Sequence, residues 1–302
     1  DQACSSLPCY NAEHGHPLGG RTYWMNGFRM LAADIRNRAA TDVALAGEGV
    51  GESWLPYLDL MLSLEVSRER YLAPDGWETI PFFQAVHHPF ATQYGNYSSL
   101  TLPPYDPLWP KQFAPEKPLN LLDQKFSGQF YLEQARAFVW GQQPAIANFR
   151  ASHLRERPEE MAYVLRLATL RGRALKFLRH GTFLRPPELD APRLPVDFSR
   201  LSIYAGQQGL VTNFCKTLPA ALTAAWRAPD GAVGIAVASI QDSPMSARLD
   251  LTGLRDQLPE PALVYYVDEH GRKELGRFAK GKTELAIELP GHGACVVELA
   301  GK

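Results

Sequence analysis

The strongest constraint on the fold is a change of pattern near Thr182. Up to about residue 180, short apolar runs alternate with segments of helical periodicity, whereas the rest of the chain consists of short β-rich runs separated by turns. Alternating strands and helices predict a parallel α/β arrangement, and evenly spaced short strands predict an antiparallel β-sandwich. We therefore expect two domains, residues 1–183 and residues 184–302.

Periodicity locates the elements of both parts. Helices are expected at 21–38, 53–60, 127–140 and 159–180, and strands of the first part at 43–46, 61–64, 80–89 and 144–148. Strands of the second part are expected at 201–204, 221–226, 233–240, 247–251, 262–267, 283–289 and 294–299. Residues 95–120 are rich in Pro, Tyr and Trp, which predicts a long surface loop of the kind that often carries function.

Four parallel strands are half of what the common eight-stranded barrel needs. If Asp1-Gln2 ends a further strand, three and a half units are missing upstream, and an isolated half-barrel would leave two sheet edges open. The sequence thus predicts the C-terminal half of a (β/α)8 barrel followed by a β-sandwich, an α/β plus all-β architecture within a longer intact protein. A complete, smaller α/β domain with irregular topology is the alternative.

Charge and motifs exclude several functions. The net charge of −1 includes no basic excess for nucleic acid, and the longest apolar runs, such as 232–240, are too short to span a bilayer. The sequence lacks G-x-G-x-x-G, the P-loop and G-x-S-x-G, which disfavours a nucleotide enzyme and a serine hydrolase. We expect no nucleic-acid and no membrane partner; the oligomeric state and the compartment (secreted, periplasmic or cytoplasmic) stay open.

Two acids fall where barrel enzymes carry their catalytic groups, the C-terminal ends of strands. Asp1 would end one strand and Glu48 the next. Neighbouring strands lie about 4.8 Å apart, so the two carboxyl groups can converge to about 5–5.5 Å, the separation typical of retaining glycosidases. Asp1 would be the nucleophile and Glu48 the acid/base. A solvated Glu48 in a Gly-Glu-Gly turn is the plain alternative, and Glu52 is a rival for the acid role.

Aromatic and polar side chains near the strand ends suit sugar binding by stacking and hydrogen bonding. The residues expected to bind substrate are His14, His16, Trp24, Glu52, Trp54, His87 and His88. Further rings that could stack on a sugar are those of Tyr94, Tyr97 and Trp109.

We expect no metal and no cofactor. His14-x-His16 lacks a third ligand of clear spacing, and the four cysteines form no C-x-x-C pair. Cys4 and Cys9 could close a small loop as a disulfide, and the spacing leaves that open.

Several segments together resemble a bacterial family of uncharacterised domains classed with the glycoside hydrolases. That family looks distantly related to endo-α-N-acetylgalactosaminidases and the alpha-amylase superfamily. The segments that carry the resemblance are Asp1-Gln2, Cys9-Tyr10, His14-Gly15-His16-Pro17, Gly19-Gly20 to Trp24, Ala46-Gly47-Glu48-Gly49 and Gln84-Ala85-Val86-His87. Ala225-Trp226-Arg227, Asp230-Gly231 and Val233-Gly234 resemble strands of the C-terminal sandwich of such hydrolases.

The resemblance implies a nucleophilic Asp after the fourth barrel strand and an acid/base Glu after the fifth, which match Asp1 and Glu48. It implies a carbohydrate substrate, whose sugar and linkage the sequence does not determine. Because the first three strands are absent, we expect the 302-residue chain to be inactive alone. The alternatives are a non-catalytic carbohydrate-binding or scaffold protein and an inactive fragment of a longer hydrolase.

Overall fold

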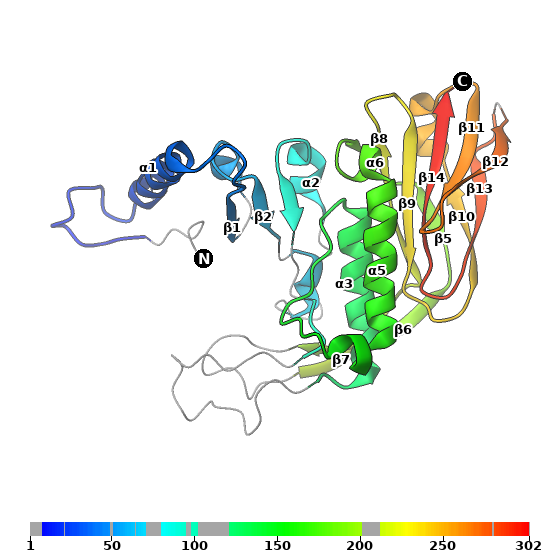
Figure 1. Cartoon of the computed structure of the whole chain (residues 1–302), viewed down its shortest axis with the longest axis horizontal. Helices are drawn as coiled ribbons and strands as arrows, with labels where there is room; N and C mark the ends of the chain where they lie inside the picture. Colours follow the sequence, from blue (N-terminus) through cyan, green and yellow to red (C-terminus); the bar gives the residue numbers. More distant parts are fainter. Residues whose placement is uncertain are drawn as a thin grey trace.

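The computed structural model describes residues 8–20, 22–48, 51–63, 65–70, 80–94, 98–101, 121–200, 212–279 and 281–301. Within these ranges the protein mixes helices with one parallel sheet and several antiparallel sheets. The N-terminal elements lie at one end, a layer of helices stands in the middle, and the antiparallel strands form the other end (Figure 1).

The parallel sheet follows the order of the sequence. It consists of β1 (Ala46–Glu48), β2 (Leu60–Leu62) and β3 (Thr92–Tyr94), with β2 in the centre. Glu48 lies opposite Leu62, and Leu62 opposite Tyr94. Tyr94 of β3 also forms a parallel β-bridge with Gln143, so that pairing in the same direction continues beyond the third strand. The first two expected strands, 43–46 and 61–64, are therefore confirmed as β1 and β2, with their bounds shifted to Ala46–Glu48 and Leu60–Leu62.

Three local expectations in this region are wrong. The apolar run at 80–89 forms a helix, α2 (Phe82–His87), and the strand follows it as β3. The segment 144–148 forms no strand, and pairing there is limited to the bridge at Gln143. The helix expected at 53–60 is only a 3-10 turn, η1 (Glu52–Trp54), followed by turns.

Little apolar surface is buried around the parallel sheet. Its core cluster contains four buried residues, Trp54, Met61, Phe83 and Ala91. The preceding helix α1 (Thr22–Arg38) agrees with the predicted one but has no buried residue. Its apolar Leu31 and Ile35 are 50% and 44% exposed, so much of its apolar stripe faces solvent.

The middle layer is built of helices, one of which is almost entirely buried. It comprises α3 (Ser127–Val139), α4 (His153–Glu156), α5 (Pro158–Arg173) and α6 (Leu175–Leu178), with η2 (Glu65–Arg70) and η4 (Gln124–Phe126) beside α3. Every residue of α3 from Gln129 to Val139 is buried. The predicted helices at 127–140 and 159–180 are confirmed, the second being divided after Arg173 into α5 and α6.

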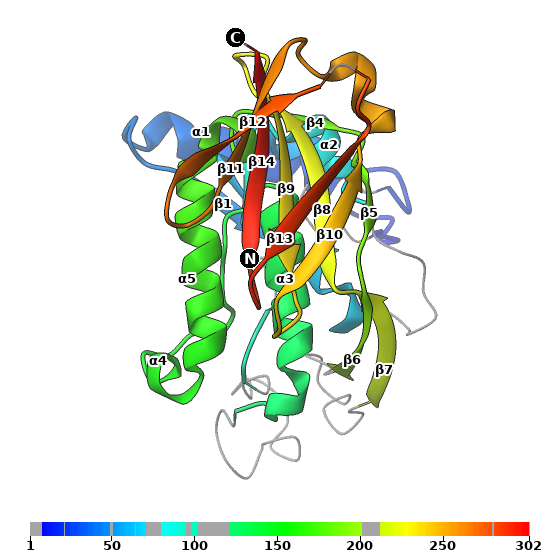
Figure 2. The same ribbon diagram turned by 90° about the vertical axis from the view of Figure 1, so that its right-hand side faces the viewer.

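The C-terminal part consists of two packed antiparallel sheets and a hairpin. The strands are β4 (Thr182–Leu184), β5 (Glu188–Asp190), β6 (Arg193–Arg200), β7 (Thr212–Pro219), β8 (Ala221–Arg227), β9 (Val233–Ser239), β10 (Met245–Asp250), β11 (Ala262–Val267), β12 (Arg272–Phe278), β13 (Glu284–Leu289) and β14 (Ala294–Gly301), with η5 (Thr252–Gln257) between β10 and β11. One sheet has the order β12-β11-β14-β9-β8-β4, the other β13-β10-β5, and β6 pairs with β7 (Figure 2).

Strand β9 is buried on both faces because the six-stranded sheet lies between two layers. Its Ile235 and Val237 pack in one cluster with Leu249 and Ile287 of the smaller sheet. Its Ala236 and Ala238 belong instead to the cluster that contains the helices. Covering both faces explains why the sequence of β9 is continuously apolar rather than alternating.

Helices and sheet are also joined by buried hydrogen bonds. Trp226 Nε1 donates to the carbonyl oxygen of Val139 at 3.0 Å, and the Tyr163 hydroxyl donates to the carbonyl oxygen of Ser239 at 3.0 Å. These bonds and the shared apolar cluster tie α3 and α5 to the antiparallel sheet. The division of the chain at residues 183 and 184 therefore stays a prediction.

All six strands expected after residue 220 are confirmed, namely β8, β9, β10, β11, β13 and β14. The strand at 201–204 lies outside the described residues, and β12 was not anticipated. Among the helices that the structure describes, none combines the length and apolarity needed to cross a bilayer.

Candidate functional site

Glu48 lies at the carboxyl end of β1 and is half-buried. The preceding Gly47 packs closely on Leu58, whose Cδ1 would lie 2.5 Å from a Cβ at this position and would have to move. Glu48 is thus the last residue of the first parallel strand, and its catalytic role stays a prediction. Asp1 lies outside the described residues, so the separation of the two carboxyl groups stays a prediction.

Hydrogen bonds made by Asp59 and Arg36 connect the residue before β1 with the residues before β2. The Asp59 carboxylate accepts a hydrogen bond from the Leu45 backbone N–H at 2.9 Å, and Arg36 of α1 donates to the Tyr57 carbonyl at 2.8 Å. The Leu45 N–H, and after it the Arg36 guanidinium, hold the pKa of Asp59 below its usual value. Asp59 is thus ionised near neutral pH and anchors α1 beside the strand that ends in Glu48.

The structure brings together two of the predicted site residues, Glu52 and His87. His87 Nε2 and Glu52 Oε1 are 3.1 Å apart, although 35 residues separate them along the chain. Glu52 begins η1, just after β1, and its side chain is 72% exposed, whereas His87 ends α2 and is 13% exposed. The pair places an exposed carboxylate and an imidazole on the loops next to the parallel sheet.

The predicted aromatic residues form a packed row rather than an open platform. Trp24 is half-buried with its ring 5.0 Å from that of Phe28, which in turn lies 6.3 Å from Trp54. Trp54 is 3% exposed and belongs to the core below the sheet. Trp24 Nε1 is buried and has no hydrogen-bond partner within the described ranges, so an incoming acceptor could satisfy it.

His88 lies apart from this group. It is 3% exposed, and its ring packs against Trp226 of the six-stranded sheet, with centroids 4.5 Å apart and an interplanar angle of 49°. Burial lowers the pKa of His88 to about 4, with the nearby Arg179 and Arg171 contributing. An interior imidazole kept neutral in this way acts as a packing residue, and sugar binding by His88 has no support from its position.

His14 and His16 lie in the loop before α1, where they meet Cys9. One ligand atom from each of these three residues lies within 4.8 Å of the other two. The sequence interpretation did not associate Cys9 with this pair, although the spacing Cys9-x4-His14-x-His16 was visible. Among the described residues, this is the group that could hold a metal ion.

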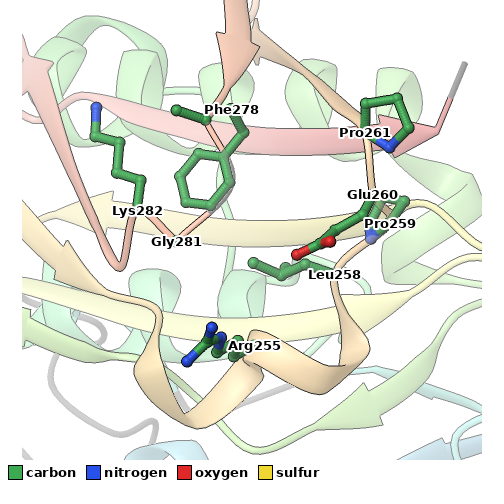
Figure 3. A pocket seen from close by; sticks show the side chains of 9 residues that line it. Arg255, Leu258, Pro259, Glu260, Pro261, Phe278, Gly281 and Lys282 are labelled. Atoms are coloured by element: carbon green, nitrogen blue, oxygen red, sulfur yellow. The ribbon is translucent and has the colours of Figure 1, made fainter.

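A separate pocket of about 320 Å³ lies in the C-terminal part, between η5 and the turn after β12. Figure 3 shows Phe278 and Lys282 on one side of it, Leu258 and Glu260 on the other, and Arg255 below them. The predicted site residues do not line this pocket. It is therefore distinct from the edge of the parallel sheet where Glu48 lies.

Comparison with known proteins gives one family match and several remote structural likenesses. Residues 1–98 match a family described as "Domain of unknown function (DUF6259)". None of the curated proteins matches the chain.

Solved structures similar to this chain are glycoside hydrolases. A GH27 β-L-arabinopyranosidase from Geobacillus stearothermophilus is 12% identical with a TM-score of 0.44, over 93% of this chain and 54% of that one. A noncanonic maltogenic α-amylase from Thermotoga neapolitana is 10% identical with a TM-score of 0.49, over 96% and 60%. A GH51 arabinofuranosidase from Xanthomonas axonopodis pv. citri is 13% identical with a TM-score of 0.35, over 92% and 62%. The chain thus spans 54–62% of the length of these structures.

Proposed function

We propose that this protein is a retaining glycoside hydrolase, with Glu48 as the acid/base and Asp1 as the nucleophile. The observation that supports it most is the placement of Glu48 at the carboxyl end of the first of three parallel strands. Barrel enzymes carry their catalytic side chains at this end. A nucleophile from the neighbouring strand would lie within the separation of about 5–5.5 Å that the retaining mechanism needs.

The proposal includes a (β/α)8 barrel of which the parallel sheet is one part. Consecutive strands lie side by side in sequence order, and the bridge from Tyr94 to Gln143 adds a fourth position in the same direction. The exposed Leu31 and Ile35 of α1 give independent support. Apolar residues gathered on one helix face usually pack against a neighbour, and in a closed barrel the next helix covers them.

The polar groups on the segments next to the parallel sheet suit a polyhydroxylated substrate. The Glu52 carboxylate accepts hydrogen bonds, and its contact with His87 fixes its orientation. A sugar hydroxyl both donates and accepts, so a carboxylate next to an imidazole can satisfy it. In the reaction, Glu48 would give its proton to the leaving oxygen while Asp1 attacks the anomeric carbon; Glu48 would then take a proton from the water that releases the sugar.

The decisive experiment assays the protein on a panel of aryl α- and β-glycosides. Glu48→Gln should lower kcat by about 10²–10⁴-fold, which is the usual contribution of a general acid–base group. Asp1→Asn should abolish the covalent step. Glu284→Gln, an exposed glutamate on β13, is the matched control and should leave the rate unchanged.

Each outcome has a separate meaning. The anomer formed first, observed by NMR, should have the configuration of the substrate. A large loss in Glu52→Gln with a small loss in Glu48→Gln would move the acid role to Glu52. Sugar binding without turnover, unaffected by Glu48→Gln, would instead identify a non-catalytic carbohydrate-binding protein.

A further inference from the structure

Three metal-binding side chains meet in the loop before α1. The Cys9 sulfur lies 3.2 Å from His14 Nδ1, and the third donor, from His16, is within 4.8 Å of both. In a tetrahedral zinc site with Zn–S of about 2.3 Å and Zn–N of about 2.0–2.1 Å, sulfur and nitrogen ligands stand about 3.6 Å apart. The separations between the three donors therefore need to change by no more than about 1.5 Å for them to surround one ion.

The loop that carries these residues is closed by its own backbone bonds. Gly19 N–H donates to the Cys9 carbonyl oxygen at 2.7 Å, which joins the two ends of the loop. Gly15 and Gly19 have φ of +55° and +71°, values that residues with a side chain rarely adopt. The chain can therefore turn back on itself and bring His14 and His16 next to Cys9.

His16 presents one nitrogen without a partner. Its Nδ1 lies 3.1 Å from the Pro17 carbonyl oxygen, which can only accept, so Nδ1 carries the hydrogen. Nε2 then has a lone pair; this atom is buried and makes no hydrogen bond to any part of the chain that the structure describes. A ring that donates one N–H to a backbone carbonyl and keeps the other nitrogen available is typical of metal-bound histidine.

A neighbouring ring holds His16 in place. Its imidazole stacks on Tyr23 of α1 with a centroid distance of 4.1 Å and an interplanar angle of 3°. The stack limits rotation of the side chain, so less rotamer freedom remains to be lost when a ligand binds. This anchoring favours a preformed site over a chance approach of exposed side chains.

His14 is held by Asn11. The Asn11 amide nitrogen lies 3.0 Å from His14 Nε2, which leaves Nδ1–H directed at the Cys9 sulfur. Metal binding at Nδ1 requires that proton to move to Nε2, so the Asn11 amide must turn to present its oxygen. That oxygen now accepts from the Glu13 N–H at 2.8 Å, and this bond would be given up.

We propose that Cys9, His14 and His16 bind one Zn²⁺ ion. One thiolate and two imidazoles match the ligand preference of zinc. Three protein ligands leave the fourth position to water, an arrangement found in zinc sites that act on a bound molecule rather than in closed structural ones. Binding displaces the Cys9 thiol proton, so affinity should fall as the pH is lowered.

The test is a titration of the reduced, chelator-treated chain with Co²⁺, followed by absorbance. We expect one equivalent of Co²⁺ to produce a thiolate-to-cobalt charge-transfer band and visible bands of tetrahedral intensity, both removed by one equivalent of Zn²⁺. The readout is spectroscopic and does not depend on the proposed hydrolase activity.

Substitutions then assign the ligands. Cys9→Ser should remove the charge-transfer band and weaken Zn²⁺ binding by at least about 100-fold, since even outer-shell partners of a metal contribute 10–100-fold. Cys215→Ser, at an exposed thiol on β7, is the matched control and should keep both band and affinity. His16→Gln should weaken binding in the same way, whereas His270→Gln, at an 83% exposed side chain, should not.

Circular dichroism of each variant checks that the fold is retained. Failure of the wild-type chain to bind one equivalent would refute the site. A band of unchanged strength in Cys9→Ser, or loss of the band in Cys215→Ser, would equally overturn the assignment.

Discussion

The imidazole of His88 lies against the indole of Trp226, with ring centroids 4.5 Å apart, and joins the segment before β3 to strand β8 of the six-stranded sheet. His88 is 3% exposed, and a Cβ at Gly141 would lie 2.7 Å from its Cε1. The other ring edge of Trp226 meets Phe183, and its Nε1 donates to Val139. His88 thus occupies a tight interior position where a charged ring cannot be hydrated.

This position predicts a pH-dependent loss of stability. Burial, with Arg179, Arg171 and His180 nearby, lowers the pKa of folded His88 to about 4, against about 6.5 in the unfolded chain. Because the folded value is the lower one, the contribution is complete above pH 6.5 and is lost as the pH falls toward 4. The free energy of unfolding should fall by about 1.4 kcal/mol per pH unit over that window.

Urea unfolding at several pH values between about 7 and 4.5 measures the effect. His88→Phe should remove this part of the slope while keeping a ring in contact with Trp226, and His270→Gln, at an exposed position, should leave the slope unchanged. A wild-type slope that persists in His88→Phe would show that other groups account for the acid sensitivity.

Two glycines are expected to respond in opposite directions to the same substitution. A Cβ at Gly234 of β9 would lie 2.5 Å from Cγ of Phe177, so Gly234→Ala should lower the free energy of unfolding by about 1–3 kcal/mol through overpacking. Gly172, on the exposed side of α5, has no atom within 4 Å of the added Cβ. Gly172→Ala should raise stability by about 0.5–1 kcal/mol because alanine favours the helix. Thermal unfolding of both variants checks the pair, and a stabilised Gly234→Ala would contradict the packing described here.

Helices and strands could be predicted from the sequence where their pattern of buried residues is simple. The helix at 127–140 and the strands from β8 to β11 could be predicted because each presents a clear period or a buried run. Strand β12 could not, since it is an edge strand whose residues are exposed or half-buried and largely charged, so no apolar alternation marks it. The three-residue β3 contains two polar residues and is too short to produce a pattern.

The apolar run at 80–89 shows a different limit. A short apolar segment fits a buried strand and a helix equally well by periodicity. Pro81 precedes the first residue of α2, a position proline tolerates at a helix start. The deciding factor is tertiary: Phe83 packs into the small core below the sheet while Phe82 remains 63% exposed.

For the candidate site, residue types were visible but their grouping was not. Glu52 and His87 could be named from the sequence, whereas their contact depends on the packing of α2 beside η1. Cys9 was seen only as a possible disulfide partner, because nothing in the spacing reveals that Gly15 and Gly19 turn the loop back toward it.

A buried ion pair fixes η2 on α3 and should be costly to break. Arg136 donates to both carboxylate oxygens of Glu69 at 3.0 Å, and the two side chains are 8% and 4% exposed. Arg136→Met would leave the buried Glu69 carboxylate with the more distant Arg68 guanidinium at 3.8 Å, which should lower the free energy of unfolding by about 3 kcal/mol, the lower end of the range for a broken buried pair. Arg248→Met breaks an exposed pair with Asp190 and should cost less than about 1 kcal/mol. Denaturant unfolding of the two variants makes the comparison, and equal losses would argue against a special role for the buried pair.

The acid/base role proposed for Glu48 predicts a specific dependence on the leaving group. A leaving aryl oxide of low pKa departs without receiving a proton, whereas an alkyl or sugar leaving group needs one from the general acid. Glu48→Gln should therefore lose much more kcat/KM on a disaccharide than on a dinitrophenyl glycoside, by at least about tenfold. Glu284→Gln should show the same ratio as the unsubstituted protein. Steady-state kinetics on the two substrate classes measures the ratio. An equal loss on both substrates would mean that Glu48 supports the structure of the site or binds sugar, and that the proton comes from another group, for which Glu52 beside His87 is the first to examine.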